Sequence, residues 1–257
     1  MNEIEYLKDT LRKLTGFDAE HYKERPFKRR VRVRMRARKV ESFKEYAELL
    51  MRDREEIRKL LDTLTINVSR FFRNKETFDF IEKHIFPFFP DGLRIWSAGC
   101  ATGEEPYSLA ILLMENRKEK NSKILASDID ENALKKAQEG IYPLLSFTET
   151  PDYIKNTYFM EIEDGKWEIK ESVKELVEFH CFDLAKIPGD FRDFDIIMCR
   201  NVLIYLSREF QENLIREFHR RLKDGGFLIL GKVEMLVGDT RDLFYALEPK
   251  ERVYRKL

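Results

Sequence analysis

Residues 95–108 read IWSAGCATGEEPYS, in which a short apolar run passes through a loop of small residues into the start of a helix. Small residues at such a turn let the backbone approach a ligand closely. The spacing differs from the G-x-G-x-x-G of dinucleotide-binding turns. Acidic side chains at positions 104 and 105 would repel a pyrophosphate, whereas they suit a cationic cofactor without a phosphate. An ordinary strand-to-helix turn is the alternative explanation for the same residues.

The sequence after Pro90 alternates short apolar runs with amphipathic helices. Strands are expected at 93–98, 124–127, 177–182, 194–199 and 227–231, and helices at 104–115, 131–139 and 208–223. This alternation predicts right-handed crossovers and a mainly parallel sheet. Two final runs, 243–247 and 252–257, flank a short turn and predict a terminal antiparallel hairpin. A plain dinucleotide-binding fold lacks that hairpin, whereas the Rossmann-like sheet of class I S-adenosylmethionine (SAM)-dependent methyltransferases has it.

The alternation of strands and helices is interrupted between Gly140 and Val177. Two short runs, Tyr158–Met160 and Trp167–Ile169, flank an Asp-Gly pair at 164–165, which is typical of tight turns. We therefore expect a small β-subdomain, at about residues 145–177, inserted into an α/β domain that spans residues 76–257.

The first 75 residues have the spacing of helices. Ile4, Leu7, Leu11 and Leu14 recur on one helical face, and Gly16 follows as a stop signal. The sequence predicts an all-helical N-terminal domain over residues 1–75.

One segment of this domain is strongly basic. The stretch from Lys23 to Lys39 has ten basic residues and one acid, a charge of +9 that the rest of the chain balances with −9. Its alternation from Arg30 formally indicates a strand, but its helical neighbours and helix-forming residues favour a helix with Val31 and Met35 inward. An anionic partner is expected to bind the arginines of this helix, which are Arg29, Arg30, Arg32, Arg34, Arg36 and Arg38.

Three alternatives for the basic helix stay open: a solvated helix face, a nucleic-acid contact and an anionic membrane surface. No aromatic residues alternate with the arginines, as they usually do in single-strand binders, and the overall pI is close to neutral at about 6.9. We therefore expect no nucleic acid as a partner.

Composition argues against several classes of protein. No apolar run approaches the roughly 20 residues of a membrane span, and the start of the chain lacks a secretory signal, so a cytoplasmic protein without membrane insertion is expected. Three scattered cysteines and four scattered histidines predict neither a disulfide framework nor a metal site. No obvious dimerisation helix is present, and a monomer is expected.

Two acids follow the second expected strand. An acid at the position of Asp128 can accept hydrogen bonds from the ribose hydroxyls of an adenosine. Asp130 fits the cap of the helix at 131–139, which leaves Asp128 for the ribose. The alternative is that one of these acids is a helix cap and nothing more.

Four segments, taken in order, resemble the CheR-type family of chemotaxis receptor (protein-glutamate O-) methyltransferases. They are TINVSRFFR at 65–73, TGEEPYS at 102–108, ASDID at 126–130 with GIY at 140–142, and CRNVLIY at 199–205. The resemblance covers nearly the whole chain. It implies an all-helical N-terminal domain and a SAM-binding α/β domain with an inserted β-subdomain. It also implies methyl transfer from SAM to glutamate side chains of chemoreceptor cytoplasmic coiled coils, which yields methyl esters and S-adenosylhomocysteine (SAH) in receptor adaptation.

The same resemblance implies the site residues. Those that contact the cofactor are Asn67, Ser69, Arg73, Gly99, Glu105, Asp128, Asp183, Leu184, Arg200 and Asn201. Those nearest the reacting carboxylate are Arg73, Arg200 and Tyr205. Ser69 and Asp183 replace the family's usual Thr and Asn, and both keep a hydrogen-bond acceptor. A short loop at 163–166 of the inserted hairpin predicts independence from a receptor C-terminal pentapeptide.

The chemistry explains the lack of a catalytic base. A glutamate side chain has a pKa of about 4.3 and is already anionic at neutral pH, so the enzyme needs orientation rather than deprotonation. We expect Arg73 or Arg200 to orient the carboxylate and Tyr205 to donate a hydrogen bond to it. Core packing of Tyr205 and a surface ion pair of Arg73 are the simpler alternatives. A nucleic-acid methyltransferase and a cofactor-sensing regulator without transfer are the competing functions.

Overall fold

The computed structural model describes residues 2–65, 69–90 and 92–257. It divides the chain into two compact units. The helical unit comprises Met1–Asn67 with Tyr205–Gln211, and the sheet unit comprises Val68–Ile204 with Glu212–Leu257. The expected boundary between residues 75 and 76 differs from this division, in which the chain passes between the units at residues 67 and 68, 204 and 205, and 211 and 212.

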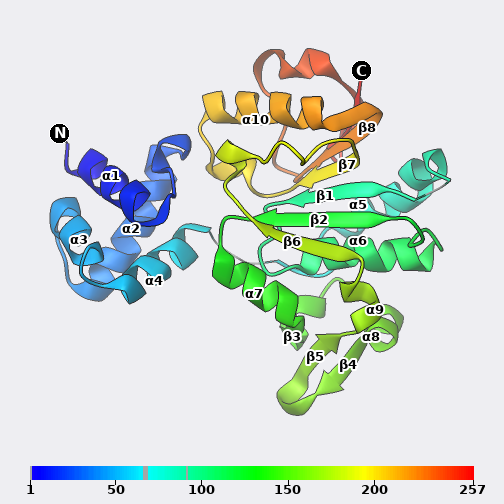
Figure 1. Ribbon diagram of the computed structural model, residues 1–257, viewed down its shortest axis with the longest axis horizontal. Helices are drawn as coiled ribbons and strands as arrows, with labels where there is room; N and C mark the ends of the chain where they lie inside the picture. Colours follow the sequence, from blue (N-terminus) through cyan, green and yellow to red (C-terminus); the bar gives the residue numbers. More distant parts are fainter. Residues whose placement is uncertain (1, 66–68, 91) are drawn as a thin grey trace. The chain divides into compact units, whose positions relative to one another are not determined.

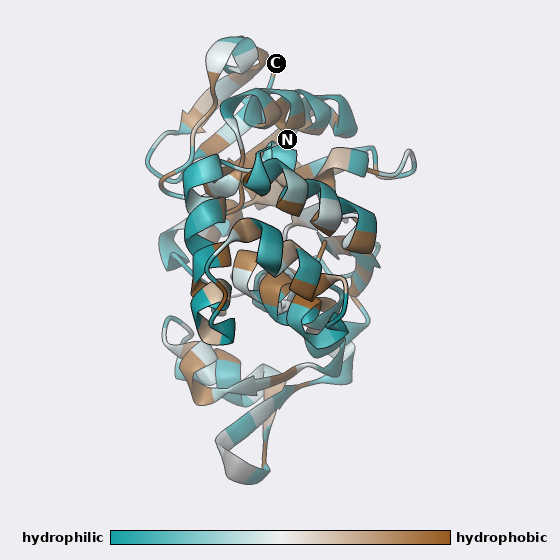
Figure 2. Cartoon of the chain, turned by 90° about the vertical axis from the view of Figure 1, so that its left-hand side faces the viewer, coloured by the Kyte–Doolittle hydropathy of each residue, from teal (hydrophilic) through white to brown (hydrophobic). Residues whose placement is uncertain are grey.

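The helical unit contains α1 (Glu3–Thr15), α2 (Glu24–Arg38), α3 (Phe43–Leu50) and α4 (Arg54–Thr65), with a 3-10 turn at Ala19–His21. Figure 2 shows hydrophilic and hydrophobic stretches along these helices, as amphipathic sequences require. Gly16 ends α1 in the left-handed conformation and donates its N–H to the Arg12 carbonyl, which confirms the stop signal. Leu14 is 42% exposed, so the expected apolar face of α1 stops one turn earlier.

The basic segment forms α2 and not a strand, which confirms the helical interpretation. Val31 and Met35 are buried, as a helical period of 3.6 residues predicts for positions four apart. The packing of this apolar stripe thus favours a helix more strongly than the alternating pattern of arginines favours a strand.

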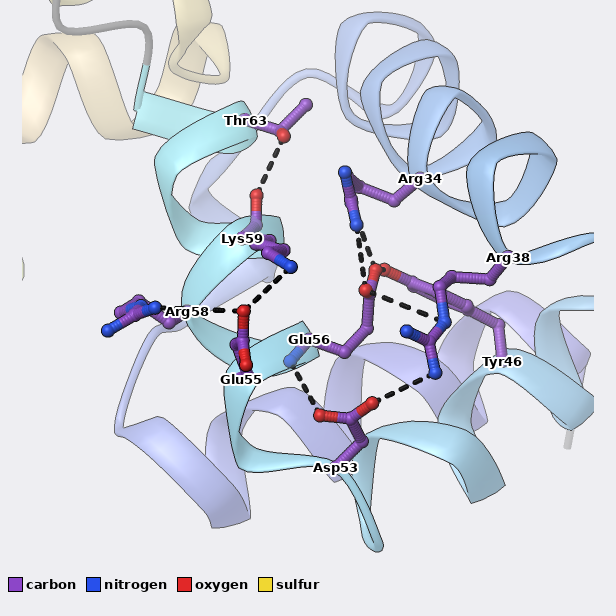
Figure 3. Close-up of polar contacts among 9 residues, drawn as sticks. All are labelled: Arg34, Arg38, Tyr46, Asp53, Glu55, Glu56, Arg58, Lys59 and Thr63. Carbon is purple, nitrogen blue, oxygen red and sulfur yellow. Dashed lines mark hydrogen bonds and ion pairs between the residues drawn. The ribbon is translucent and has the colours of Figure 1, made fainter.

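A buried carboxylate joins three helices of this unit (Figure 3). Glu56 of α4 accepts from Nε and Nη2 of Arg34 on α2, at 3.0 and 2.7 Å, and from the Tyr46 hydroxyl on α3 at 2.7 Å. Arg38 lies 3.8 Å from the same carboxylate and also pairs with Asp53. Burial opposes ionisation of Glu56, but these donors lower its pKa overall.

The sheet unit is built on a seven-stranded sheet of order β6-β2-β1-β7-β8-β10-β9 (Figure 1). The strands are β1 (Arg94–Ala98), β2 (Lys123–Asp128), β6 (Val177–Cys181), β7 (Phe194–Cys199), β8 (Leu222–Leu230), β9 (Phe244–Glu248) and β10 (Val253–Lys256). The first five are parallel in the sheet, and β10 pairs antiparallel with both β8 and β9. The predicted parallel sheet with a terminal antiparallel hairpin is confirmed, and this is the class I methyltransferase topology.

Three helices follow strands as expected, α6 (Glu104–Glu115), α7 (Glu131–Glu139) and α10 (Arg208–Arg221). A further helix, α5 (Lys75–Phe80), precedes β1, and a π-helical turn at Ile81–Ile85 and a 3-10 turn at Phe86–Phe88 extend it. Side chains of β1 alternate between two buried layers: Ile95 belongs to the same cluster as Leu109 of α6, whereas Trp96 packs edge-on against Phe218 of α10. The described residues contain no helix with the length and apolar character for a membrane crossing.

The inserted subdomain is a small three-stranded sheet. Strands β4 (Phe159–Ile162) and β5 (Lys166–Ile169) form the predicted antiparallel hairpin, joined by a turn at Glu163–Gly165. A further strand, β3 (Ile141–Pro143), pairs with the other edge of β5. The subdomain sheet therefore begins before residue 145, because a three-residue strand has too little pattern to be seen in sequence. Two short helices, α8 (Asp152–Tyr158) and α9 (Glu171–Lys174), flank the hairpin.

Backbone contacts explain why residues just before 75 belong to the sheet unit. The N–H of Phe71 donates to the Ser146 carbonyl at 2.9 Å, and the N–H of Phe72 donates to the Ser108 hydroxyl at 2.9 Å. The Phe71 ring stacks on Phe147. These residues are thus fixed to α6 and to the segment after β3.

Candidate active site

The parallel strands bring the predicted cofactor residues to one edge of the sheet. Cα partners in the register include Ala98 with Ser127 and Asp128 with Cys181, and Cys199 of β7 pairs with β8 at Leu230. The loops that leave the carboxyl ends of these strands therefore start side by side, which is where open α/β sheets bind ligands.

The loop after β1 approaches its neighbours closely. Gly99 has φ +79° and donates its N–H to the Ser127 carbonyl at 2.8 Å. A Cβ atom on Gly99 would overlap Cγ2 of Val202, in the loop after β7. Ala101 also has a positive φ, of 48°, which is rare for a residue with a side chain. The small residues of this loop thus meet a real steric demand, unlike those of an ordinary turn.

Asp128 ties this loop to β2. One carboxylate oxygen accepts from the N–H of Ala101 at 2.8 Å, and the other accepts from the N–H of Asp130 at 2.9 Å. A carboxylate can accept about four hydrogen bonds, so Asp128 has capacity for an external donor. Asp130 caps α7 through the N–H groups of Asn132 and Ala133, which confirms its predicted role. The ribose contact of Asp128 stays a prediction.

Arg200 lies at the centre of a network of buried polar groups. Its side chain is 2% exposed, and its Nη1 lies 3.5 Å from Oε2 of Glu105. Its Nη2 donates to the Arg73 carbonyl and to Oδ1 of Asn74, both at 2.7 Å. Glu105 also accepts from the Ser97 hydroxyl at 2.8 Å. This arrangement fixes Arg200 between the start of α6 and the segment after residue 69.

Burial dominates the electrostatics of this edge. It raises the pKa of Glu105 above 4.5 although Arg200 opposes the shift, and it raises the pKa of Asp128 above 3.8 against the backbone donors. Burial likewise raises the pKa of Glu104 and lowers that of Arg200. A nearby cation stabilises the ionised form of a buried carboxyl group, so this site suits a positively charged ligand.

Glu234 is a functional candidate that the sequence analysis missed. It is 3% exposed, and its Oε2 accepts from the N–H groups of Asn201 at 2.8 Å and Gly231 at 2.7 Å. Its Oε1 accepts from the N–H of Ile204 at 3.3 Å. The carboxylate thus holds the loop that follows Arg200, where Asn201 has φ +62°. An acid just after the last parallel strand was the available signal.

The other predicted cofactor residues lie in the same unit. Ser69 and Arg73 are partly buried, and Asp183 accepts from the N–H of Ala185 at 2.9 Å and so caps the turn that begins at Leu184. Asn67 lies outside the described residues. Within the described ranges, no group of three or more His, Cys, Asp or Glu side chains is placed to hold a metal ion.

Tyr205 belongs to the helical unit, whereas Arg73 and Arg200, the other two predicted catalytic residues, belong to the sheet unit. Its carbonyl accepts from the N–H of Lys23 at 2.9 Å, and its neighbour Leu206 forms an antiparallel bridge with Tyr22. Its ring lies under the guanidinium of Arg30, with Cζ 4.1 Å from the ring centroid. Pairing with residues near the start of the chain thus joins the segment around Tyr205 to the helical unit, and no local sequence pattern predicts that pairing.

The structure also divides the six arginines expected to bind a partner. Arg30 is buried and donates to the Leu64 carbonyl, and Arg34 and Arg38 pair with Glu56. The residues exposed on α2 around one open hollow of about 510 Å³ include Arg29, Arg32 and Arg36, with Arg25, Lys28, Val33 and Glu24 beside them. Because Arg30 is buried and Arg34 and Arg38 pair with Glu56, the arginines that remain as candidates for partner binding are Arg29, Arg32 and Arg36.

Comparisons with known proteins agree with this geometry. A family model described as "CheR methyltransferase, all-alpha domain" matches residues 2–65, and one described as "CheR methyltransferase, SAM binding domain" matches residues 67–253. A chemotaxis protein methyltransferase of Borreliella burgdorferi is 34% identical over 87% of this chain and 84% of its own length. One from Listeria monocytogenes is 33% identical over 90% of this chain and 89% of its own. Chemotaxis protein methyltransferase 2 of Pseudomonas aeruginosa is 33% identical over 91% and 87%.

Proposed function

The chain belongs to the CheR methyltransferase family, and we propose that it methylates glutamate side chains of chemoreceptors in bacterial chemotaxis. It is a SAM-dependent methyltransferase. The observation that carries the proposal is that the two CheR family models match the chain from residue 2 to residue 253. A receptor-directed function follows from relatives named as chemotaxis protein methyltransferases, which share both halves of the chain.

The carboxyl edge of the sheet has the chemistry to hold SAM. Its loop approaches a neighbour at Gly99 too closely for a side chain, and its buried acids have pKa values raised by burial. We assign the ribose to Asp128 and the positive end of the cofactor to the surroundings of Glu105. The remaining cofactor contacts proposed are Asn67, Ser69, Arg73, Gly99, Asp183, Leu184, Arg200 and Asn201. When bound, SAM supplies a sulfonium methyl group, which a carboxylate oxygen takes while the bonding pair stays on sulfur, and no proton moves.

We assign the orientation of the substrate carboxylate to Arg73 rather than Arg200. The Nη groups of Arg200 already serve Glu105, Asn74 and the Arg73 carbonyl, and its side chain is buried. Arg200 therefore positions the segment that carries Arg73. A guanidinium can hold a carboxylate in two-point contact without quenching it as a nucleophile if one oxygen stays accessible. Tyr205 donates a hydrogen bond to the same carboxylate.

The outer arginines of α2 are the proposed contact with the receptor. A receptor methylation region is an acidic coiled coil, so Arg29, Arg32 and Arg36 would raise the rate of association. The turn at Glu163–Gly165 is short, in keeping with recruitment that does not need a receptor C-terminal pentapeptide. We propose that the protein is cytoplasmic, since the cytoplasmic part of the receptor is its substrate. We also propose that it is a monomer.

The deciding experiment combines the protein with radiolabelled SAM and a receptor cytoplasmic fragment. Label on the fragment that is released by mild base indicates a carboxyl methyl ester. Label that appears only on DNA or RNA, with strongly salt-dependent binding, would favour a nucleic-acid substrate instead. SAM binding with no transfer to any substrate would favour a regulator.

Arg73→Ala tests the assigned role of Arg73. We expect turnover to fall by about 100-fold or more, since substrate orientation is lost, with little change in unfolding. Arg70→Ala is the matched control, because Arg70 lies three residues away and its exposed side chain pairs with Glu149 at 3.8 Å. Wild-type turnover of Arg73→Ala would refute the assignment.

A further inference from the structure

Arg30 occupies the inner face of the helix whose outer face carries the receptor-binding arginines. It is 6% exposed, and its Nη1 donates to the Leu64 carbonyl in the last turn of α4. Its guanidinium carbon lies 4.1 Å from the centroid of the Tyr205 ring. Its Nε is buried and has no hydrogen-bond partner among the described residues. A buried cation with an unsatisfied donor is costly unless another interaction offsets the cost, and the tyrosine ring provides one.

The backbone around Tyr205 is held to the segment that leads into α2. The N–H of Lys23 donates to the Tyr205 carbonyl at 2.9 Å, and the N–H of Ser207 donates to the His21 carbonyl at 2.7 Å. The His21 ring stacks on Phe210 with centroids 4.2 Å apart. The start of α2 therefore fixes the main chain at Tyr205, and Arg30, just under two turns further along α2, fixes the ring.

We infer that Arg30 is a positioning residue for Tyr205, and that one helix both recognises the receptor and orients the tyrosine hydroxyl. This inference rests on the proposed hydrogen bond from Tyr205 to the substrate carboxylate. A phenol ring rotates about two side-chain bonds, and a planar guanidinium stacked on its face restricts both. The simpler role for Arg30 is a cap on the last carbonyl groups of α4, which would affect folding but not the chemical step.

The two roles separate in steady-state kinetics with the receptor fragment. Arg30→Gln removes the cation over the ring, and because its amide nitrogen takes the place of Nε it also loses the Nη1 donor to the Leu64 carbonyl. We expect kcat to fall about ten-fold, as a misplaced catalytic group requires, with KM for the receptor nearly unchanged. Arg30→Lys keeps the charge without the planar group and should recover part of kcat. Arg32→Gln, on the outer face, should instead raise KM.

A matched control is available within the same unit. Tyr46→Phe removes a buried hydroxyl that donates to Glu56 at 2.7 Å, so it lowers the stability of the helical unit without touching Tyr205. Its kcat should stay at the wild-type value under conditions where circular dichroism shows a folded protein. An equal loss of kcat in Tyr46→Phe and Arg30→Gln would mean that both act through stability, which overturns the inference.

A double-substitution cycle with Tyr205→Phe isolates the path through the hydroxyl. Tyr205→Phe keeps the ring under Arg30 and removes the donor. If Arg30 acts through that donor, Arg30→Gln should cause no further loss of kcat in the Tyr205→Phe background. If the losses of kcat from Arg30→Gln and Tyr205→Phe multiply in the double variant, or if Arg30→Gln has the wild-type kcat, the positioning role of Arg30 is refuted while the proposed role of Tyr205 stands. Wild-type kcat in Tyr205→Phe would refute the proposed role of Tyr205 and, with it, this inference.

A variant that fails to fold still leaves a test. Should Arg30→Gln not yield folded protein, Arg30→Lys is compared with wild type, because its amine can reach the Leu64 carbonyl but cannot stack as a plane. A several-fold loss of kcat that disappears in the Tyr205→Phe background supports the inference. A wild-type kcat in folded Arg30→Lys overturns it.

Discussion

Replacing Gly99 by alanine should damage the cofactor loop in two separable ways. Gly99 has φ +79°, where an L-residue costs about 1–2 kcal/mol. The new methyl group would also overlap Cγ2 of Val202, which adds roughly 1–3 kcal/mol for overpacking. We therefore expect the sheet unit to lose about 2–5 kcal/mol of unfolding free energy, and SAH to bind at least ten-fold more weakly because the loops after β1 and β7 must separate.

Two further variants divide this total. Gly165→Ala is the matched control, because Gly165 lies in the same unit at φ +66° with no atom within 4 Å of an added Cβ, so it measures the backbone cost alone. Val202→Ala removes the overlapping methyl group and keeps the Val202 Cβ, which would lie 3.7 Å from the added atom, an ordinary contact distance. Gly99→Ala combined with Val202→Ala should thus be less damaging than the two single losses added together.

Tryptophan fluorescence during urea unfolding measures these effects in the sheet unit. Both tryptophans of the chain, Trp96 and Trp167, lie in that unit, so the helical unit is silent in this signal. Isothermal calorimetry with SAH then gives the affinity. The reasoning is refuted if Gly99→Ala is no more destabilising than Gly165→Ala, or if Val202→Ala recovers nothing.

Three further predictions test the remaining parts of the structure. Glu234→Gln should lower the stability of the sheet unit by about 1–2 kcal/mol in the fluorescence assay, because an amide can replace only one acceptor oxygen while it relieves some cost of burial. Glu248→Gln keeps an oxygen for its one exposed hydrogen bond, from the N–H of Lys250, and should change the stability by less than about 0.5 kcal/mol. Glu56→Gln should cost the helical unit about 3–5 kcal/mol by leaving arginine charge unpaired, seen in far-ultraviolet circular dichroism but not in tryptophan fluorescence; coincident loss in both signals would contradict this. Since burial raises the pKa of Glu105 and Asp128, their negative charge is lost earlier as the pH falls than that of exposed carboxyl groups. Calorimetry should therefore show the affinity for SAM falling with pH more than the affinity for SAH, a ligand without the sulfonium charge. Equal pH dependence of the two ligands would argue against a sulfonium beside these acids.

Elements with local end signals were predictable from the sequence. The helix at 131–139 was placed correctly because Asp130 caps its start and Gly140 ends it in a left-handed conformation. The helix at 104–115 and the strand at 194–199 were also placed to the residue, since their apolar runs are bounded by loops of small or polar residues. Local chemistry decides such boundaries.

Features that depend on distant contacts were not predictable. Strand β3 is three residues long and exists because β5 offers it a free edge. Tyr205 joins the helical unit through hydrogen bonds to residues more than 180 positions earlier. Glu234 gained its importance from two backbone donors, Asn201 and Ile204, in a loop some 30 residues before it. The strand ends that carry the predicted cofactor residues could thus be located from sequence, while the groups that hold these loops in shape required the fold.

The neutral charge of the whole chain conceals a basic helix face and a group of buried acids, whose charges match ligands of opposite sign. Residues 1–67 hold 18 basic and 13 acidic side chains, and the remaining 190 residues hold 29 basic and 34 acidic ones. The excess of cations lies on the outer face of α2, where an acidic receptor would dock, and buried carboxylates gather at the sheet edge, where a sulfonium would bind. Since neither partner needs a proton moved, charge placement takes the role that a catalytic base has in other transferases. At the sheet edge, the pairing of Arg200 with Glu105 limits the negative charge that an incoming glutamate would meet, so that both a cationic cofactor and an anionic substrate can approach.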